Sequence, residues 1–348
     1  MSKFLLKQWF LRGLVACISC GLFLGTCLTS SESAAPGPSV AAASTFQAIA
    51  LKLQDFQTRG IVAFIMLLMA FSLDSQQLRA SFQTPLPVLW AGLVNFAFIP
   101  VFGWCLSHLQ MTQDYVYGLM IAASVPCTLA AASVWTRKAR GNDAVSLLVT
   151  LTTNAACFVV TPFWLTLATR NQDVELELSD MIWRLVGTVL VPTLVGQGLR
   201  CVPRLARFAT EHKTQIGVLA QSCVLVVVFV GATNAGVHLV GNSAGAGIAS
   251  TALVWISCIV MHLTAMCVGL TGARLFGFSR PDRTAIAFAS SQKTLPIGLD
   301  IAVAYFSVVP FAVFPMLMYH ASQLFIDTAI AGVFARRVET DPDRGSDC

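Results

Sequence analysis

Long uncharged runs of apolar residues are the feature that most limits what this chain can fold into. A helix needs about 20 mostly apolar residues to cross a hydrocarbon core about 30 Å thick. Only 11% of the 348 residues are charged, less than half of the roughly 25% usual in soluble domains. We therefore predict an all-α polytopic membrane protein with ten transmembrane helices. Its expected spans are 13–31, 60–73, 80–113, 115–136, 144–169, 185–199, two helices within 214–273, 284–306 and 310–334.

The distribution of basic residues predicts the orientation of these spans. If both termini are cytoplasmic, 17 of the 22 lysines and arginines lie in inner segments, four lie in outer ones, and Lys293 lies inside a span. Cytoplasmic loops of membrane proteins carry such an excess. We expect an integral protein of the plasma (inner) membrane, with the lipid bilayer as partner and no nucleic-acid surface. The first apolar run is either a helix or a cleaved secretory signal, because Lys3, Lys7 and Arg12 precede it.

The chain is expected to form one transmembrane domain, residues 1–335. Five helices per half is an odd number, so the second half must enter the membrane from the opposite side. This predicts two inverted repeats, at about 9–169 and 181–335. The segment 29–58 is rich in Ser, Ala and Pro and is expected to be a flexible outer linker, and 336–348 a disordered cytoplasmic tail.

Two spans contain a proline among polar residues near their middle. Pro126 lies in the fourth span and Pro296 in the ninth, which are matching places in the two halves. Proline removes a backbone donor, and the freed carbonyls are tolerated at membrane depth only beside protein or a water-filled cavity. Either proline alone could be a simple kink. Discontinuous helices at matching positions favour a binding site of a transporter.

Lys293 is the single residue that most strongly indicates a functional site. It lies nine positions past Thr284, about 14 Å along a helix and therefore near the bilayer midplane. A lysine there costs about 2.5–3.5 kcal/mol or more on insertion scales. It either forms an internal salt bridge or faces a polar cavity, as a fixed cation or as a titrating amine. Asp300 is a poor partner because it lies seven residues on, beyond Pro296.

The other polar residues within spans carry weaker signals. His262 and His320 are each expected to be hydrogen-bonded packing residues, and Asp327 an interfacial residue near the end of the last span. The sequence has no GxSxG, HExxH or P-loop motif. We therefore do not predict an enzyme.

Four segments resemble the sodium/bile-acid symporter family, most closely its SBF-like branch. The resemblance extends from Trp9 to about Arg337, and its most specific match is the turn Ala139-Arg140-Gly141-Asn142. The other matching segments are Phe64 to Leu73 followed by Gln77-Leu78, Asn95 to Pro100, and Ser290 to Thr294.

The resemblance implies the fold and the kind of site. In this family, two inverted five-helix repeats form a panel domain and a core domain, and the unwound fourth and ninth helices cross at mid-membrane. One sodium site would fall on Ala132, Ser133, Ser146, Thr150 and Phe288, and a second on Asn95, Phe288 and Gln292. Phe288 stands where both sites need a glutamate, and Lys293 where sodium-coupled members carry an asparagine. At most a weak sodium site at Ser133, Ser146 and Thr150 is implied.

We therefore predict a secondary active transporter that moves a small organic anion by alternating access. The Lys293 ammonium would replace one bound cation; a neutral Lys293 would instead permit proton coupling. No cofactor is expected, and the coupling ion is sodium or a proton. Two alternatives stay open: a cation/proton antiporter using Asp300, and a non-transporting membrane regulator. The sequence does not name the substrate or the oligomeric state. The expected substrate- or ion-binding residues are Asn95, Ser133, Ser146, Thr150, Ser290, Ser291, Gln292, Lys293 and Thr294, beside the helix breaks at Pro126 and Pro296.

Overall fold

The computed structural model describes residues 9–32, 58–73, 85–129, 131–170, 176–239 and 247–340. These residues form helices and short connections, with no strand among them. Five of the described helical stretches are long and apolar enough to cross a membrane by length and composition. The all-helical membrane protein predicted from the sequence is therefore confirmed. The five stretches are Pro85–Ser107, Asp143–Thr169, Leu178–Leu199, Lys213–Val237 and Ile248–Leu275.

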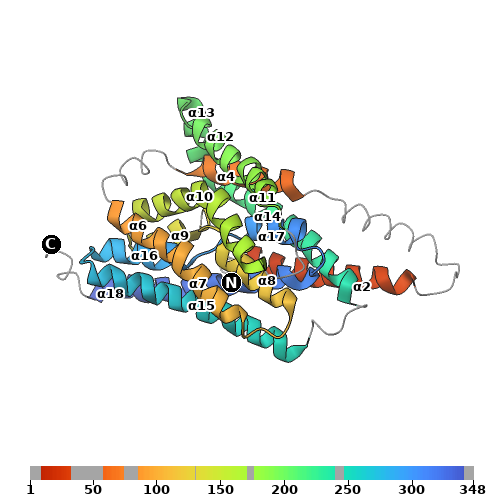
Figure 1. Cartoon of the computed structure of the whole chain (residues 1–348). Coiled ribbons are helices and arrows are strands. Elements are labelled where there is room, and N and C mark those ends of the chain that lie inside the picture. Colours follow the sequence, from red (N-terminus) through yellow and green to blue (C-terminus); the bar gives the residue numbers. More distant parts are fainter. Residues whose placement is uncertain are drawn as a thin grey trace.

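By their contacts the helices form two groups, which meet where α10 contacts α11 and where α17 contacts α4 and α14. Figure 1 shows the arrangement of these helices. In the first group, α14 packs on α2 and α4, and α4 packs on α12. In the second group, α15 lies beside α16 and α18, while α10 contacts α8, α9 and α16. The first group comprises α2 (Trp9–Glu32), α4 (Thr58–Ser72), α11 (Leu178–Leu185), α12 (Val191–Leu199), α13 (Pro203–Glu211) and α14 (Lys213–Leu239). The second comprises α6 (Pro85–Leu93), α7 (Ile99–Ser107), α8 (Gln113–Ser124), α9 (Ala131–Lys138), α10 (Asp143–Thr169), α15 (Ile248–Leu275), α16 (Arg280–Ser291), α17 (Leu295–Tyr305) and α18 (Val313–Thr340).

Two helices are interrupted at the predicted prolines. α8 ends at Ser124 and α9 begins at Ala131, while α16 ends at Ser291 and α17 begins at Leu295. The four half-helices have 8 to 12 residues each. None is long enough to cross a bilayer alone. Each crossing at these places therefore needs both halves of its helix.

Several boundaries differ from the sequence prediction, each for a physical reason. The span expected to begin at Leu185 begins at Leu178, because Arg184 lies inside the helix and pairs with Asp300. The basic segment after Leu199 contains the short helix α13, which was not expected. The two helices expected within 214–273 are α14, which ends at Leu239, and α15, which begins at Ile248.

Two predicted flexible segments are tested only at their ends. Most of the outer linker 29–58 lies outside the described residues, although α2 extends to Glu32 and α4 begins at Thr58. α18 extends to Thr340, so the start of the expected tail, residues 336–340, is helical rather than disordered.

Gly196 allows α12 to approach α4 closely. A Cβ atom at Gly196 would lie 2.7 Å from the carbonyl oxygen of Leu67 and 2.9 Å from the backbone nitrogen of Phe71, whereas a Cβ at Gly198 would meet nothing within 4 Å. We expect Gly196→Ala to destabilise the protein by about 1–3 kcal/mol through overpacking. Gly198→Ala should leave stability almost unchanged. Thermal unfolding of the purified protein in detergent measures both, and equal melting temperatures for the two variants would contradict the packing argument.

Candidate functional site

The Lys293 ammonium group lies where the two interrupted helices meet. The side chain is fully buried. Its Nζ donates to the carbonyl oxygen of Val125 at 2.8 Å, to that of Asn95 at 2.8 Å and to Asn95 Oδ1 at 3.2 Å. No carboxylate among the described residues forms an ion pair with it. The charge is therefore stabilised by oriented dipoles and not by a salt bridge.

A π-helical turn makes the Asn95 carbonyl available to Lys293. In η1 (Val94–Phe98), the amide of Ile99 bonds to the Val94 carbonyl, five residues back. The next residue, Pro100, has no N–H to donate. The Asn95 carbonyl is thus left without a helical partner, and the ammonium supplies one. The Phe96 carbonyl, which also lacks the Pro100 donor, accepts from Trp164 Nε1 at 2.8 Å.

The first break, between α8 and α9, has a donor for every consecutive carbonyl from Ser124 to Thr128. α10 supplies three of these donors from side chains, and the second break supplies the other two. This satisfies backbone groups that would be costly to bury unpaired. In chain order the donors are Thr161 Oγ1, Lys293 Nζ, the Thr294 amide, Asn154 Nδ2 and Thr150 Oγ1.

The second break, between α16 and α17, is held in the same way by α18. Gln323 Nε2 donates to the Lys293 carbonyl and Gln323 Oε1 accepts from the Lys293 amide, both at 3.0 Å. The Tyr319 hydroxyl donates to the Ser291 carbonyl at 2.6 Å. Asn95 Nδ2 bonds to the carbonyls of Ser290 and Gln292. Each break is thus fixed by the helix that follows it.

Asp327 was expected to be interfacial, and that prediction is wrong. Its side chain is fully buried. One carboxylate oxygen lies 3.0 Å from His262 Nε2, and the other accepts from Gln292 Nε2 at 2.6 Å. His262 Nδ1 lies 3.2 Å from the Ser291 carbonyl. Asp327 lies two turns past Tyr319 on α18 and therefore shares the face that holds the second break.

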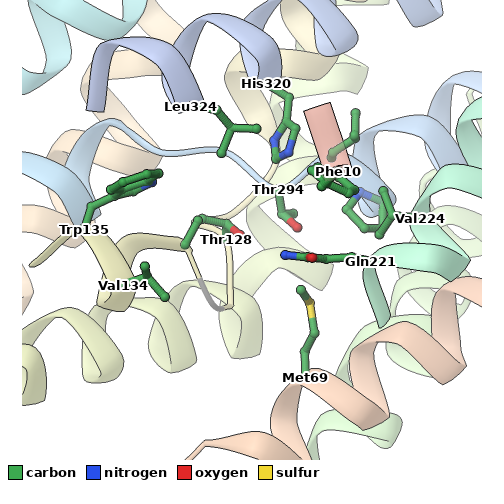
Figure 2. A pocket seen from close by; sticks show the side chains of 13 residues that line it. Phe10, Met69, Thr128, Val134, Trp135, Gln221, Val224, Thr294, His320 and Leu324 are labelled. Carbon is green, nitrogen blue, oxygen red and sulfur yellow. The ribbon is translucent and has the colours of Figure 1, made fainter. Parts of the chain in front are cut away.

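A cavity of about 160 Å³ lies between the two breaks and the first group of helices. Figure 2 shows that Thr128 and Thr294, from the two breaks, lie close to Gln221 of α14. His320 of α18 also lines it, as does Trp135, whose buried Nε1 has no hydrogen-bond partner in the described part of the chain. Apolar side chains such as Phe10 complete the wall. No acidic residue is among those lining it.

Residues 8–336 match the family model for the SBF-like CPA transporter family. The chain belongs to this family. It is therefore a transporter, and its family consists of secondary transporters, not enzymes.

Three relatives illustrate the range of similarity. The putative symporter YfeH of Escherichia coli is 23% identical over 72% of this chain and 76% of its own length. The probable sodium/metabolite cotransporter BASS4, chloroplastic, of Arabidopsis thaliana is 23% identical over 71% of this chain and 59% of its own. Sodium/bile acid cotransporter 7 of Rattus norvegicus is 22% identical over 93% of this chain and 91% of its own.

The residues expected at the transporter site fall into two sets. Asn95 and the segment 290–294 come together at the crossing, and Thr150 bonds to the first break. Ser133 lies apart from this network, where its hydroxyl donates to the Asp143 carboxylate that pairs with Arg137.

The residues implied for a sodium ion do not fit that ion in this chain. Ser133 donates its hydroxyl hydrogen to the Asp143 carboxylate, whereas Thr150 donates to the Thr128 carbonyl at the first break, so the two hydroxyls belong to different networks. Ser146 Oγ, Ser290 Oγ and Gln292 Oε1 are buried without a hydrogen-bond partner among the described residues. All three are neutral, and the Lys293 ammonium at the same crossing would repel a cation. Phe288 is fully buried and places a ring where the resemblance requires a carboxylate.

Sequence reasoning missed the side chains that hold the breaks. Asn154 and Gln323 each lie four residues after a hydroxyl that also holds a break, Thr150 and Tyr319 respectively. Polar residues at this spacing form a stripe on one helix face. Such a stripe in the span after each proline break was the signal that could have found them.

Gln323 provides a test of this support. Gln323→Leu keeps the size of the side chain but leaves the buried amide and carbonyl of Lys293 without partners. We expect a loss of about 2–6 kcal/mol, since each of the two orphaned groups costs about 1–3 kcal/mol. The matched control is Gln221→Leu in the cavity wall, which should unfold close to the wild-type temperature. Thermal unfolding in detergent compares the two variants. A Gln323→Leu protein as stable as the control would contradict the role of Gln323 in holding the second break.

Proposed function

We propose that this transporter moves a small organic anion by alternating access and binds it in the cavity beside the helix crossing. The observation that carries the proposal is that both helix breaks, through Thr128 and Thr294, meet the first group of helices at one cavity. A site between two separately packed groups is exposed to one side or the other when the groups move relative to each other.

The chemistry of the wall supports an anion. α17 begins at Leu295, which lines the cavity, and its N-cap residue Thr294 makes no capping side-chain bond. The N-terminus of a helix carries a partial positive charge and free N–H groups that bind anions. The unpartnered indole N–H of Trp135 adds a donor. With no acidic residue in the wall, these donors are not neutralised.

His320 supplies a further donor whose tautomer follows from the second break. The Lys293 amide donates to Gln323 Oε1, which fixes the orientation of the Gln323 amide group. Its NH₂ group donates one hydrogen to the Lys293 carbonyl and faces His320 Nδ1 at 2.8 Å with the other. Nδ1 therefore accepts, and the proton of a neutral His320 ring lies on Nε2. Replacing His320 would remove a donor without removing a charge.

We further propose that the chain has ten spans arranged as two inverted repeats, with the first group as panel and the second as core. The equivalent support of the two breaks favours this arrangement. An amide side chain four residues after a hydroxyl holds a break carbonyl in α10 and again in α18. With both termini cytoplasmic, the cavity would open to the cytoplasm, because it is lined by Phe10 at the start of α2.

Lys293 provides the test of ion coupling. We propose that its ammonium, bound by three oxygens, takes the place of a coupling cation at the crossing. Uptake of organic anions into proteoliposomes should therefore persist without sodium, with pH varied separately, and Lys293→Ala should lower it at least tenfold. Lys138→Ala, which removes an exposed lysine, is the control. Strict sodium dependence that survives Lys293→Ala would overturn the proposal.

The antiporter alternative required Asp300 at the crossing, but Asp300 is engaged elsewhere. Arg184 of α11 binds it through two bonds, Nε to Oδ2 at 2.9 Å and Nη2 to Oδ1 at 2.7 Å. Thr58 at the start of α4 donates to Oδ1 at 2.9 Å. On α4, Thr58 and the cavity residue Met69 are eleven positions, or about 16 Å, apart. The ion pair would thus close the side of the protein opposite the cavity.

Arg184→Ala tests this closure. The variant leaves the buried Asp300 carboxylate without its ion-pair partner, so it should shift toward the conformation open on the far side. In a cysteine-free background, a cysteine at Ala302, one half-turn past Asp300 on α17, should react severalfold faster with a membrane-impermeant maleimide. Arg137→Ala, which breaks the more exposed pair with Asp143, should have no such effect, and the charge swap Arg184→Asp with Asp300→Arg should restore protection. Unchanged labelling in Arg184→Ala would contradict the closure.

A further inference from the structure

The short helix α13 lies at the end of two spanning helices. It has nine residues, Pro203–Glu211, and at about 14 Å is too short to cross a core of about 30 Å. It connects the end of α12 at Leu199 to the start of α14 at Lys213. Figure 1 shows α13 at the tip of the molecule, beyond α12. This position places it at the membrane surface.

One side of α13 attaches it to the protein, and another apolar side is exposed. Ala209 is fully buried in a cluster with Phe71 and Ile216. Leu205 and Phe208, three residues apart, are 37% and 49% exposed. Leu194 of α12, which is part of a spanning helix, is also exposed and faces acyl chains. Leu205 and Phe208 present apolar surface just beyond the end of that helix, where the membrane interface begins.

Unpaired arginines border this apolar edge. Arg204 lies four residues before Phe208, so the two side chains are neighbours on the helix surface. Arg204 and Arg207 are exposed, and neither forms an ion pair with a carboxylate in the described ranges. Arg200 is different, because it donates to the Phe71 carbonyl at 3.0 Å and to Thr210 at 3.2 Å. The basic charge on α13 is therefore available to a ligand.

We propose that α13 binds an anionic phospholipid of the adjacent leaflet. The acyl chain lies along Leu205 and Phe208, and the phosphate is bound by Arg204 and Arg207. An apolar helix side bordered by basic residues is the pattern of helices that lie in the membrane interface. Guanidinium groups match the geometry of phosphate oxygens and bind them with two parallel bonds. The position of α13 between the ends of two spanning helices favours a lipid over a soluble partner.

The test uses the full-length protein in nanodiscs of phosphatidylcholine with increasing phosphatidylglycerol. Bound phosphatidylglycerol is counted by native mass spectrometry, and the melting temperature is followed in parallel. Arg204→Gln with Arg207→Gln should weaken phosphatidylglycerol binding by about 25-fold, since each surface basic residue contributes about fivefold. Arg204→Lys with Arg207→Lys should retain part of the affinity. The control is Arg274→Gln with Arg283→Gln, which removes the same charge from another basic segment.

Each outcome decides the proposal. Loss of phosphatidylglycerol binding and of the associated rise in melting temperature in the α13 variant alone would support it. Equal loss in the control would overturn it, because the lipid would then respond only to total charge. Unchanged binding in the α13 variant would also overturn it. Phe208→Ser tests the apolar half independently and should weaken phosphatidylglycerol of long chain length more than a short-chain form.

Discussion

The buried ammonium of Lys293 is the interaction on which the centre of this protein depends. A lysine at membrane depth is costly unless its charge is met by fixed dipoles. Its main partners are the carbonyls of Asn95 and Val125, and each is available only because the local backbone departs from an α-helix. Pro100 lacks the amide that would bond to the Asn95 carbonyl. Pro126 disfavours a helical conformation at Val125, which is extended (φ −69°, ψ 157°), so the Val125 carbonyl lies outside the helical ladder. Proline, which interrupts these helices, therefore also exposes the carbonyls that accept hydrogen bonds from the Lys293 ammonium.

The surrounding helices are arranged to make this departure tolerable. Broken helices at membrane depth leave carbonyls unpaired, and in hydrocarbon no water can replace the missing donors. α10 and α18 provide those donors from polar side chains at helical spacing. Because most bonds of the crossing lie within the second group of helices, the crossing is held as one rigid unit. The cavity lies at its edge, where that unit meets α2, α4 and α14.

The sequence was sufficient to locate both breaks and Lys293, because proline and charge in an apolar run have few explanations. Asn95 came from the family resemblance. It could not assign Asp327, whose position near the end of a span is compatible with the interface. Only the three-dimensional placement of His262 and Gln292 shows that it is buried and paired. Arg184 was misplaced for the same reason: a charge marks the end of an uncharged run, but a partner in another helix, Asp300, allows it inside. Periodicity and composition do not show which residues that are distant in the sequence pair with each other.

The polar networks of Lys293 and Asp300 differ in which helices they join. The bonds of Lys293 join elements of a single packing group, so they can persist through any movement of that group as a body. The bonds of Asp300 do not have this property, because they join α17 to Arg184 of α11 and Thr58 of α4, in the other group. Any relative movement that opens the far side must therefore rupture the Asp300 network first. If the transporter works by the proposed alternating access, the free energy of the Arg184–Asp300 pair would set the balance between the two conformations, and the bonds of Lys293 would hold the site together in both.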